Sequence, residues 1–177
     1  MSAIWLGLFR PFFLIIFFLL VDFSSKLATH LYIPLIYRSS YYFPYGGIAI
    51  FKDFLGVEFS ITHQTNTGAA WGMLSAYPEY LAVFRLIFIG SLIVYFILYL
   101  GRSSRKWPFA LIIAGALGNV LDYFLYGHVV DMFHFKFWGY QYPIFNLADS
   151  YIFCGVAWLL FLSLPEKSNK NIQTKQQ

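Results

Sequence analysis

The sequence has little charge and almost no cysteine. Only 11% of its 177 residues are charged, whereas an ordinary soluble domain has about 25%. So few charges exclude a nucleic-acid-binding surface, and the apolar content excludes a disordered chain. Because there is one cysteine, no intrachain disulfide can form, and a disulfide scaffold is excluded as well.

Apolar and aromatic residues take the place of charge, at 59% and 23% of the chain. A helix that crosses a bilayer needs about 20 mostly apolar residues. Because lipid offers no partners to free backbone groups, such segments must be helical. We therefore expect an all-α membrane protein, a single domain over residues 1–177 with a four-transmembrane-helix bundle. The four windows cover residues 12–31, 80–100, 107–126 and 145–164.

The basic residues predict the orientation of these spans. Cytoplasmic loops carry an excess of Lys and Arg. With both termini in the cytoplasm, seven basic residues lie inside and three outside; the inner ones are Arg10, Arg102, Arg105, Lys106, Lys167, Lys170 and Lys175, and the outer ones are Arg38, Lys52 and Lys136. The polar tail 165–177 is then cytoplasmic. No A-x-A-like site follows the first window, so we expect an uncleaved anchor rather than a signal peptide.

Two segments remain for the outer side, about 32–79 and 127–144. The first contains Gly46-Gly47, then Ile48–Phe51, the turn-like Asp53–Gly56 and Val57–Thr62. Short β-rich runs around a turn predict a small sheet. The aromatic residues of this segment argue against disorder and suit a platform at the membrane interface; they are Tyr41, Tyr42, Phe43, Tyr45, Phe51, Phe54 and Phe59.

Several polar side chains interrupt or adjoin the apolar windows, where a charge costs at least about 2.5–3.5 kcal/mol. Asp22 and Lys26 are four residues apart and share a helix face. They predict either a self-neutralising pair or a pair that shapes a site. Asn119 and Asp122 share a face behind two glycines, which favours a tightly packed interhelical hydrogen-bond site over direct chemistry.

Asp131 and Asp149 are the strongest catalytic candidates. One follows the third window and the other begins the fourth. Because the linked ends of two antiparallel helices lie on the same side, we expect both carboxylates to meet near the outer surface. Two close carboxylates cannot easily both ionise, and such a pair sharing one proton can hydrolyse a peptide bond.

Other interpretations of the same residues stay open at this point. The two aspartates could be unrelated helix caps. Intramembrane aspartates with Lys26 could instead serve a proton-coupled transporter or channel. A zinc site could use His128, Asp131 and His134, which recur every three residues, although no H-E-x-x-H is present. The remaining histidines, His30 and His63, have no evident partners.

Four separated sequence blocks resemble the bacterial lipoprotein signal peptidases, also called signal peptidase II. Together they extend over nearly the whole chain in the right order. They are Asp22–Lys26, Asn66–Gly72, Gly115–Asp122 continuing to Gly127–Asp131, and Phe145–Ser150.

The resemblance implies an inner-membrane aspartic endopeptidase that cuts prolipoproteins just before a diacylglyceryl-modified cysteine. It implies Asp131 and Asp149 as the catalytic pair, a four-helix fold with a small extracytoplasmic β-sheet cradle, and an active site near the periplasmic face. Substrate-binding or supporting positions fall on Asn66, Gly68, Asn119, Asp122 and Asn146, with a structural role for Asp22 and Lys26. Lipid-modified prolipoproteins and membrane lipids are the expected partners, and we expect a monomer without metal, cofactor or nucleic acid.

One position departs from the family pattern. The family usually has Arg after the aspartate of the third block, where this chain has Tyr123. A tyrosine offers one hydroxyl in place of a fixed charge and five donors. Any contact that such an arginine makes is therefore in question here, whereas the two catalytic candidates are unaffected.

Overall fold

The structure, a computed structural model, describes residues 3–36, 47–68, 78–101 and 103–164. Its four helices and four strands occur in the chain order α1, β1, β2, α2, α3, β3, β4, α4. The helices are α1 (Ala3–Tyr32), α2 (Pro78–Tyr99), α3 (Lys106–Tyr126) and α4 (Leu147–Ser163). The strands are β1 (Gly47–Phe54), β2 (Val57–Asn66), β3 (Val129–Phe137) and β4 (Tyr140–Gln141).

Three helices are long and apolar enough to cross a membrane, as the sequence predicted. Their apolar spans are Gly7–Tyr32, Glu79–Tyr99 and Lys106–Tyr126. The fourth helix is apolar but has only 17 residues. It begins after Asn146, which has an extended backbone and caps the first turn. A fourth transmembrane span therefore remains a prediction.

Helix α3 is the centre of the helical layer and packs against α1, α2 and α4. Apolar side chains from α1, α2 and α3 form its core, with Leu8, Phe96, Leu100, Ala110 and Ile113 at the centre. Glycines bring α3 close to its neighbours. A Cβ on Gly115 would collide with the Ala148 carbonyl oxygen of α4, and a Cβ on Gly118 would lie 2.5 Å from an oxygen of Asp22 in α1.

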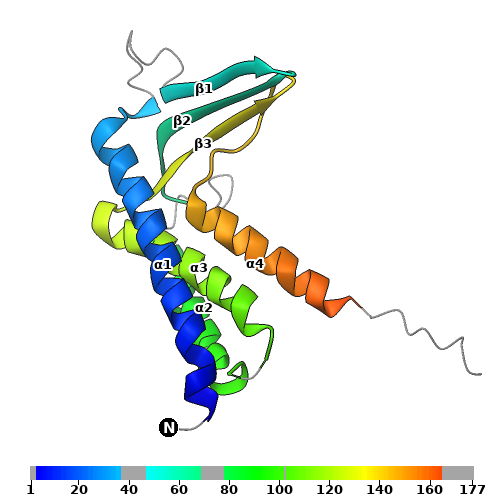
Figure 1. Cartoon of the computed structure of the whole chain (residues 1–177). Coiled ribbons are helices and arrows are strands. Elements are labelled where there is room, and N and C mark those ends of the chain that lie inside the picture. Colours follow the sequence, from blue (N-terminus) through cyan, green and yellow to red (C-terminus); the bar gives the residue numbers. More distant parts are fainter. Residues whose placement is uncertain (1–2, 37–46, 69–77, 102, 165–177) are drawn as a thin grey trace, which may run out of the picture.

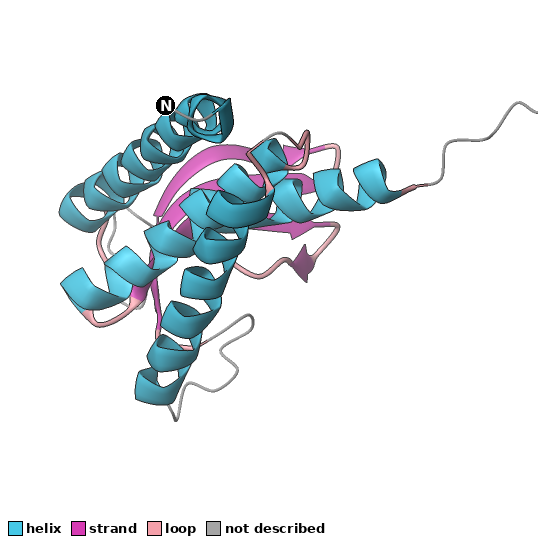
Figure 2. Ribbon diagram, turned by 90° about the horizontal axis from the view of Figure 1, so that it is seen from below, coloured by secondary structure: helices cyan, strands magenta, loops and turns pink. Residues whose placement is uncertain are grey.

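The strands form one antiparallel sheet in the order β1-β2-β3-β4. Figure 1 shows it at the end of the helices opposite the N-terminus, and in Figure 2 the strands pass behind the helices. The β1–β2 hairpin turns at Leu55 and Gly56, with φ of 55° and 81°, the left-handed pair that tight hairpins require. The sheet predicted around residues 48–62 is thus confirmed.

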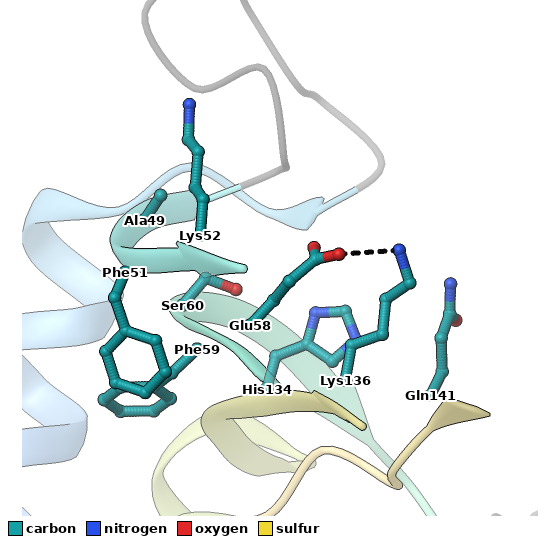
Figure 3. A pocket seen from close by; sticks show the side chains of 9 residues that line it. All are labelled: Ala49, Phe51, Lys52, Glu58, Phe59, Ser60, His134, Lys136 and Gln141. Carbon is teal, nitrogen blue, oxygen red and sulfur yellow. Dashed lines mark hydrogen bonds and ion pairs between the residues drawn. The ribbon is translucent and has the colours of Figure 1, made fainter. Parts of the chain in front are cut away.

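The two faces of the sheet differ in chemistry. On one face Glu58 of β2 pairs with Lys136 of β3 at 2.9 Å over a shallow cavity of about 240 Å³, which His134 also lines (Figure 3). The opposite face is aromatic, and its rings Phe59 and Phe135 stack with centroids 4.3 Å apart. Phe135 in turn stacks on Phe145, just before α4, at 6.0 Å. Aromatic packing therefore joins the sheet to the start of α4.

The segment 127–144 joins α3 to α4 as expected, but it also forms strands that the sequence did not predict. It contains β3, the inner strand beside β2. Asp131 lies on this strand, opposite Gln64 of β2, and not at a helix end. The aromatic residues Tyr41, Tyr42, Phe43 and Tyr45, the end of the second sequence block and the tail 165–177 lie outside the described residues.

Candidate active site

A buried ion cluster of Asp22, Lys26 and Asp122 lies between α1 and α3. The Lys26 ammonium is 2.7 Å from Asp22 Oδ2 and 2.9 Å from Asp122 Oδ2. It also donates a hydrogen bond to Asn119 Oδ1 at 3.0 Å, so the ammonium has three neighbouring oxygens. All three charged side chains are at most 1% exposed. Lys26 thus neutralises one of two buried carboxylates and binds both.

The buried ion cluster also positions the two elements that follow it in the chain. Asp22 Oδ1 accepts a hydrogen bond from the main-chain N–H of Ala148 at 2.8 Å, in the first turn of α4. Asp122 Oδ2 accepts one from Val130 N–H at 3.1 Å, at the start of β3. Ala148 directly precedes Asp149 in the sequence, and Val130 directly precedes Asp131. The buried ion cluster therefore binds the backbone next to each aspartate of the candidate pair.

Asn146 joins the two candidate aspartates directly. It is fully buried and caps α4, where its Oδ1 accepts from Asp149 N–H at 2.9 Å and its own N–H donates to Asp149 Oδ2 at 3.2 Å. This reciprocal pattern is a capping box. The Asn146 side-chain amide donates to Asp131 Oδ1 at 2.8 Å. The cap of α4 and the orientation of Asp131 thus depend on one side chain.

Two further asparagines bind the remaining carboxylate oxygens. Asn119 of α3 donates to Asp149 Oδ1 at 2.8 Å. Asn66, the last residue of β2, donates to Asp131 Oδ2 at 3.1 Å. All four oxygens of the pair therefore accept a hydrogen bond. Their donors come from β2, α3 and the cap of α4, elements that are far apart in the sequence.

Burial makes the charged form of Asp131 costly. The side chain is 4% exposed, and this burial, followed by the nearby Asp149 carboxylate, raises the pKa of Asp131 to about 7. The hydrogen bonds from Asn66 and Asn146 act in the opposite direction. At neutral pH the pair can therefore hold one proton on Asp131, which is the state that acid–base chemistry at a carbonyl requires.

Three cavities open around the pair and differ in lining. The site cavity, about 480 Å³, is lined by both aspartates together with apolar residues of α4 such as Phe153 and Val156. A polar cavity of about 710 Å³ extends from Asp131 over Gln64–Gly68 and Tyr140–Ile144. An aromatic cavity of about 520 Å³ lies beside Asp149 between α4 and the sheet. Both apolar and polar substrate parts therefore have space next to the carboxylates.

The structure brings together all nine residues that the sequence singled out for the site. Gly68, the last of them, donates its N–H to Asn66 Oδ1 at 2.9 Å. The sequence did not single out Arg85 of α2, which lines the site cavity and donates to the Gly68 carbonyl at 2.8 Å. An arginine inside an otherwise apolar window was the signal for it.

The histidines are not arranged as a metal site needs. His128 precedes β3, and Asp131 and His134 are three apart on a strand, which places them on opposite faces. Within residues 3–36, 47–68, 78–101 and 103–164, no group of three His, Cys, Asp or Glu side chains could hold a metal. His30 and His63 do have partners, contrary to expectation: their rings lie 5.4 Å apart, and His63 Nδ1 is 2.9 Å from the Ile33 carbonyl oxygen.

Comparisons with known proteins agree on one family. A family model described as signal peptidase (SPase) II matches residues 14–165. Lipoprotein signal peptidases of Staphylococcus aureus, for example those of strains JH9 and Newman, are 38% identical over 112 residues, which are 63% of this chain and 69% of theirs. A solved bacterial membrane enzyme superposes with a TM-score of 0.72 at 27% identity over 94% of each chain. A second such structure gives a TM-score of 0.70 at 27% identity over 89% of this chain and 94% of the other.

Proposed function

This chain belongs to the signal peptidase II family of membrane peptidases that process lipoproteins, and we propose that it is an aspartic endopeptidase whose catalytic pair is Asp131 and Asp149. The observation that carries this proposal is the hydrogen bonding of Asn146 to both carboxylates. The site cavity, which both carboxylates line, gives a peptide bond access to the pair.

The proposed reaction uses one carboxylate as base and one carboxyl as acid. The Asp149 carboxylate takes a proton from a water molecule while the water oxygen attacks the scissile carbonyl carbon. The Asp131 carboxyl gives its proton to the carbonyl oxygen, and a tetrahedral diol forms. The Asp149 carboxyl then gives its proton to the amide nitrogen, the C–N bond breaks, and one diol hydroxyl returns its proton to the Asp131 carboxylate as the carbonyl re-forms. The products are the carboxyl end of the signal peptide and the free amine of the next residue.

The substrate is a prolipoprotein, and we propose that it is cut before a cysteine that carries diacylglyceryl. Such a substrate is already anchored in the bilayer, so the scissile bond is presented where the membrane ends. The apolar linings of the site and aromatic cavities suit acyl chains and the apolar part of a signal peptide, and the polar cavity suits peptide backbone. In this proposal the reaction needs neither metal nor cofactor.

We propose further that residues 1–177 form a single domain with four transmembrane helices in the bacterial inner membrane. Both termini are then cytoplasmic, and the sheet and the catalytic pair lie at the periplasmic face. Lipid surrounds the helices, and the monomer is the working unit. The sheet and the N-terminus lie at opposite ends of the helices (Figure 1), which supports this orientation together with the excess of basic residues on the inner side.

The test is cleavage of a diacylated prolipoprotein by the purified full chain in proteoliposomes. Asp131→Asn and Asp149→Asn should each lower kcat at least about 1,000-fold, because the pair acts as a unit. Asp53→Asn, the same change at an exposed position of β1, should leave kcat unchanged. An Asp149→Asn enzyme as active as the wild type would refute the proposal.

The zinc-site and transporter alternatives give different results in this preparation. A zinc peptidase would lose activity on strong chelation, whereas the proposed enzyme keeps it. A proton-coupled transporter would carry a proton flux and is not favoured, because the chain belongs to a family of peptidases.

A further inference from the structure

Arg85 lies in an unusual position for a charged residue. It is half-buried in the second turn of α2, a helix whose interior is otherwise apolar. Charged side chains are unfavourable in the apolar part of a bilayer, so such residues are generally paired and functional. Arg85 lines the site cavity together with Asp131 and Asp149.

Three consecutive hydrogen bonds connect Arg85 to Asp131. Arg85 Nη2 donates to the Gly68 carbonyl oxygen at 2.8 Å. Gly68 N–H donates to Asn66 Oδ1 at 2.9 Å, and Asn66 Nδ2 donates to Asp131 Oδ2 at 3.1 Å. The Gly68 N–H and carbonyl belong to consecutive peptide units, so this relay fixes positions rather than moving protons. Arg85 therefore holds the residues that hold Asp131.

Asp149 has a matching connection on the opposite side. Asn119 Nδ2 donates to Asp149 Oδ1 at 2.8 Å, and Asn119 Oδ1 accepts from Lys26 Nζ at 3.0 Å. Each catalytic carboxylate is thus bound by one asparagine, and each asparagine leads to one cation. Lys26 already has two carboxylates as partners, whereas Arg85 lines the site cavity together with Asp131 and Asp149.

We propose that Arg85 is a positioning residue of the peptidase, which fixes the Asn66–Gly68 turn against Asp131 and supplies a positive charge beside the catalytic pair. This inference rests on the proposed function. The family usually has Arg where this chain has Tyr123, so α3 offers no cation at that position. In this chain the cation that lines the site cavity comes from α2.

The test measures kcat, KM and the pH profile of proteoliposomes that contain the full chain, with a diacylated prolipoprotein peptide as substrate. Arg85→Gln should lower kcat about 100-fold with KM changed by less than about threefold, because misplacement of a reacting group affects the chemical step. A nearby cation favours the charged form of a carboxyl, so its removal should raise the carboxyl pKa. Both the acid and the alkaline limb of the kcat/KM profile should therefore move to higher pH by about one unit.

Two variants serve as comparisons. Arg85→Lys keeps the charge but loses the planar fork, so its pH limbs should coincide with those of the wild type while kcat falls at least about threefold. Arg105→Gln makes the neutralising change at an exposed residue before α3 and should match the wild type in all three quantities. If Arg85→Gln fails to fold, the Arg85→Lys variant provides the test. In that case, pH limbs of Arg85→Lys that differ from those of the wild type overturn the inference.

The possible outcomes separate this inference from the proposed function. Arg85→Gln with kcat within twofold of the wild type overturns the inference, provided that the wild type cleaves and Asp131→Asn does not; the proposed function then stands. A lower kcat with unmoved pH limbs also overturns it, because a purely structural role would give that result. A wild type that does not cleave, or an active Asp131→Asn enzyme, overturns the proposed function instead.

Discussion

Asn146 donates its side-chain amide to Asp131 at 2.8 Å and so connects the cap of one helix to a neighbouring strand. Asn146 is the extended residue that caps α4, and Asp131 lies within β3, so this hydrogen bond links two different elements. Asp131 is 4% exposed. This burial is the main cause of its raised pKa.

Cleavage should fall as the pH rises through about 7. The pKa of Asp131 is raised to about 7, mainly by burial and then by Asp149. The proposed reaction needs the Asp131 proton, so kcat/KM should decline above this pH as the proton is lost. Asn66→Ala removes a hydrogen bond that favours the charged form, which should move this alkaline limb to higher pH. Measured pH profiles of the two enzymes check both statements, and a limb that moves to lower pH would contradict them.

Lys26→Met should destabilise the protein strongly. The change leaves Asp22 and Asp122 buried without their cation, and breaking a buried ion pair from one side costs about 3–5 kcal/mol. Lys136→Met is the matched control, because its partner Glu58 is 40% exposed and such surface pairs contribute about 0–1 kcal/mol. Thermal unfolding in detergent gives the comparison. Equal Tm values for the two variants would show that the buried cluster does not stabilise the fold.

Gly115→Ala should separate α3 from α4 and lower both Tm and kcat. Its Cβ would collide with the Ala148 carbonyl oxygen, which is backbone and cannot rotate away. The displaced α4 carries Asp149, so activity should fall more steeply than stability. Gly90→Ala in α2 is the control, since nothing lies within 4 Å of its added Cβ. Wild-type cleavage by Gly115→Ala would mean that this close approach of the helices is dispensable.

Acid should weaken the junction between α1 and the sheet. Burial lowers the pKa of both His63 and His128, and neighbouring histidines lower them further. A histidine whose folded pKa is lowered contributes stability above about pH 6.5 that is lost as the pH falls, because the unfolded chain binds more protons. Protonation of Asp131, whose pKa is raised to about 7, acts in the opposite direction, so the prediction concerns the difference between two proteins: on going from pH 7 to pH 5, the Tm of His128→Gln should change less unfavourably than that of the wild type. An unchanged pH dependence in this variant would exclude His128 as a cause.

The sequence predicted the membrane-crossing helices well because apolar length is a local property. The windows 80–100 and 107–126 lie within two residues of α2 and α3. The β1–β2 hairpin was also predicted from its own residues. Strand β3 was missed, although Phe133, Phe135 and Phe137 alternate with His134 and Lys136, which is the two-residue period of a strand. The adjoining apolar window favoured a helical interpretation of this part of the sequence instead.

The candidate site could be predicted in part for a similar reason. Asp131 and Asp149 stood out because charge is rare in this chain, but their hydrogen-bond donors come from elements up to 65 residues away. Arg85 was visible as an isolated charge, yet its connection to the pair passes through Gly68 and Asn66. The ring contact between His30 and His63 joins α1 to β2. Such pairings arise from tertiary packing, which no local pattern encodes.

The dependence on Asn146 has a consequence for biosynthesis. A ribosome delivers α1, α2 and α3 to the membrane before the residues that cap and form α4. Until that last helix docks, Asp131 lacks the amide that orients it and has no Asp149 beside it. Under the proposed mechanism the chain is therefore inactive until α4 docks, and a copy truncated before α4 would not cleave its neighbours in the bilayer.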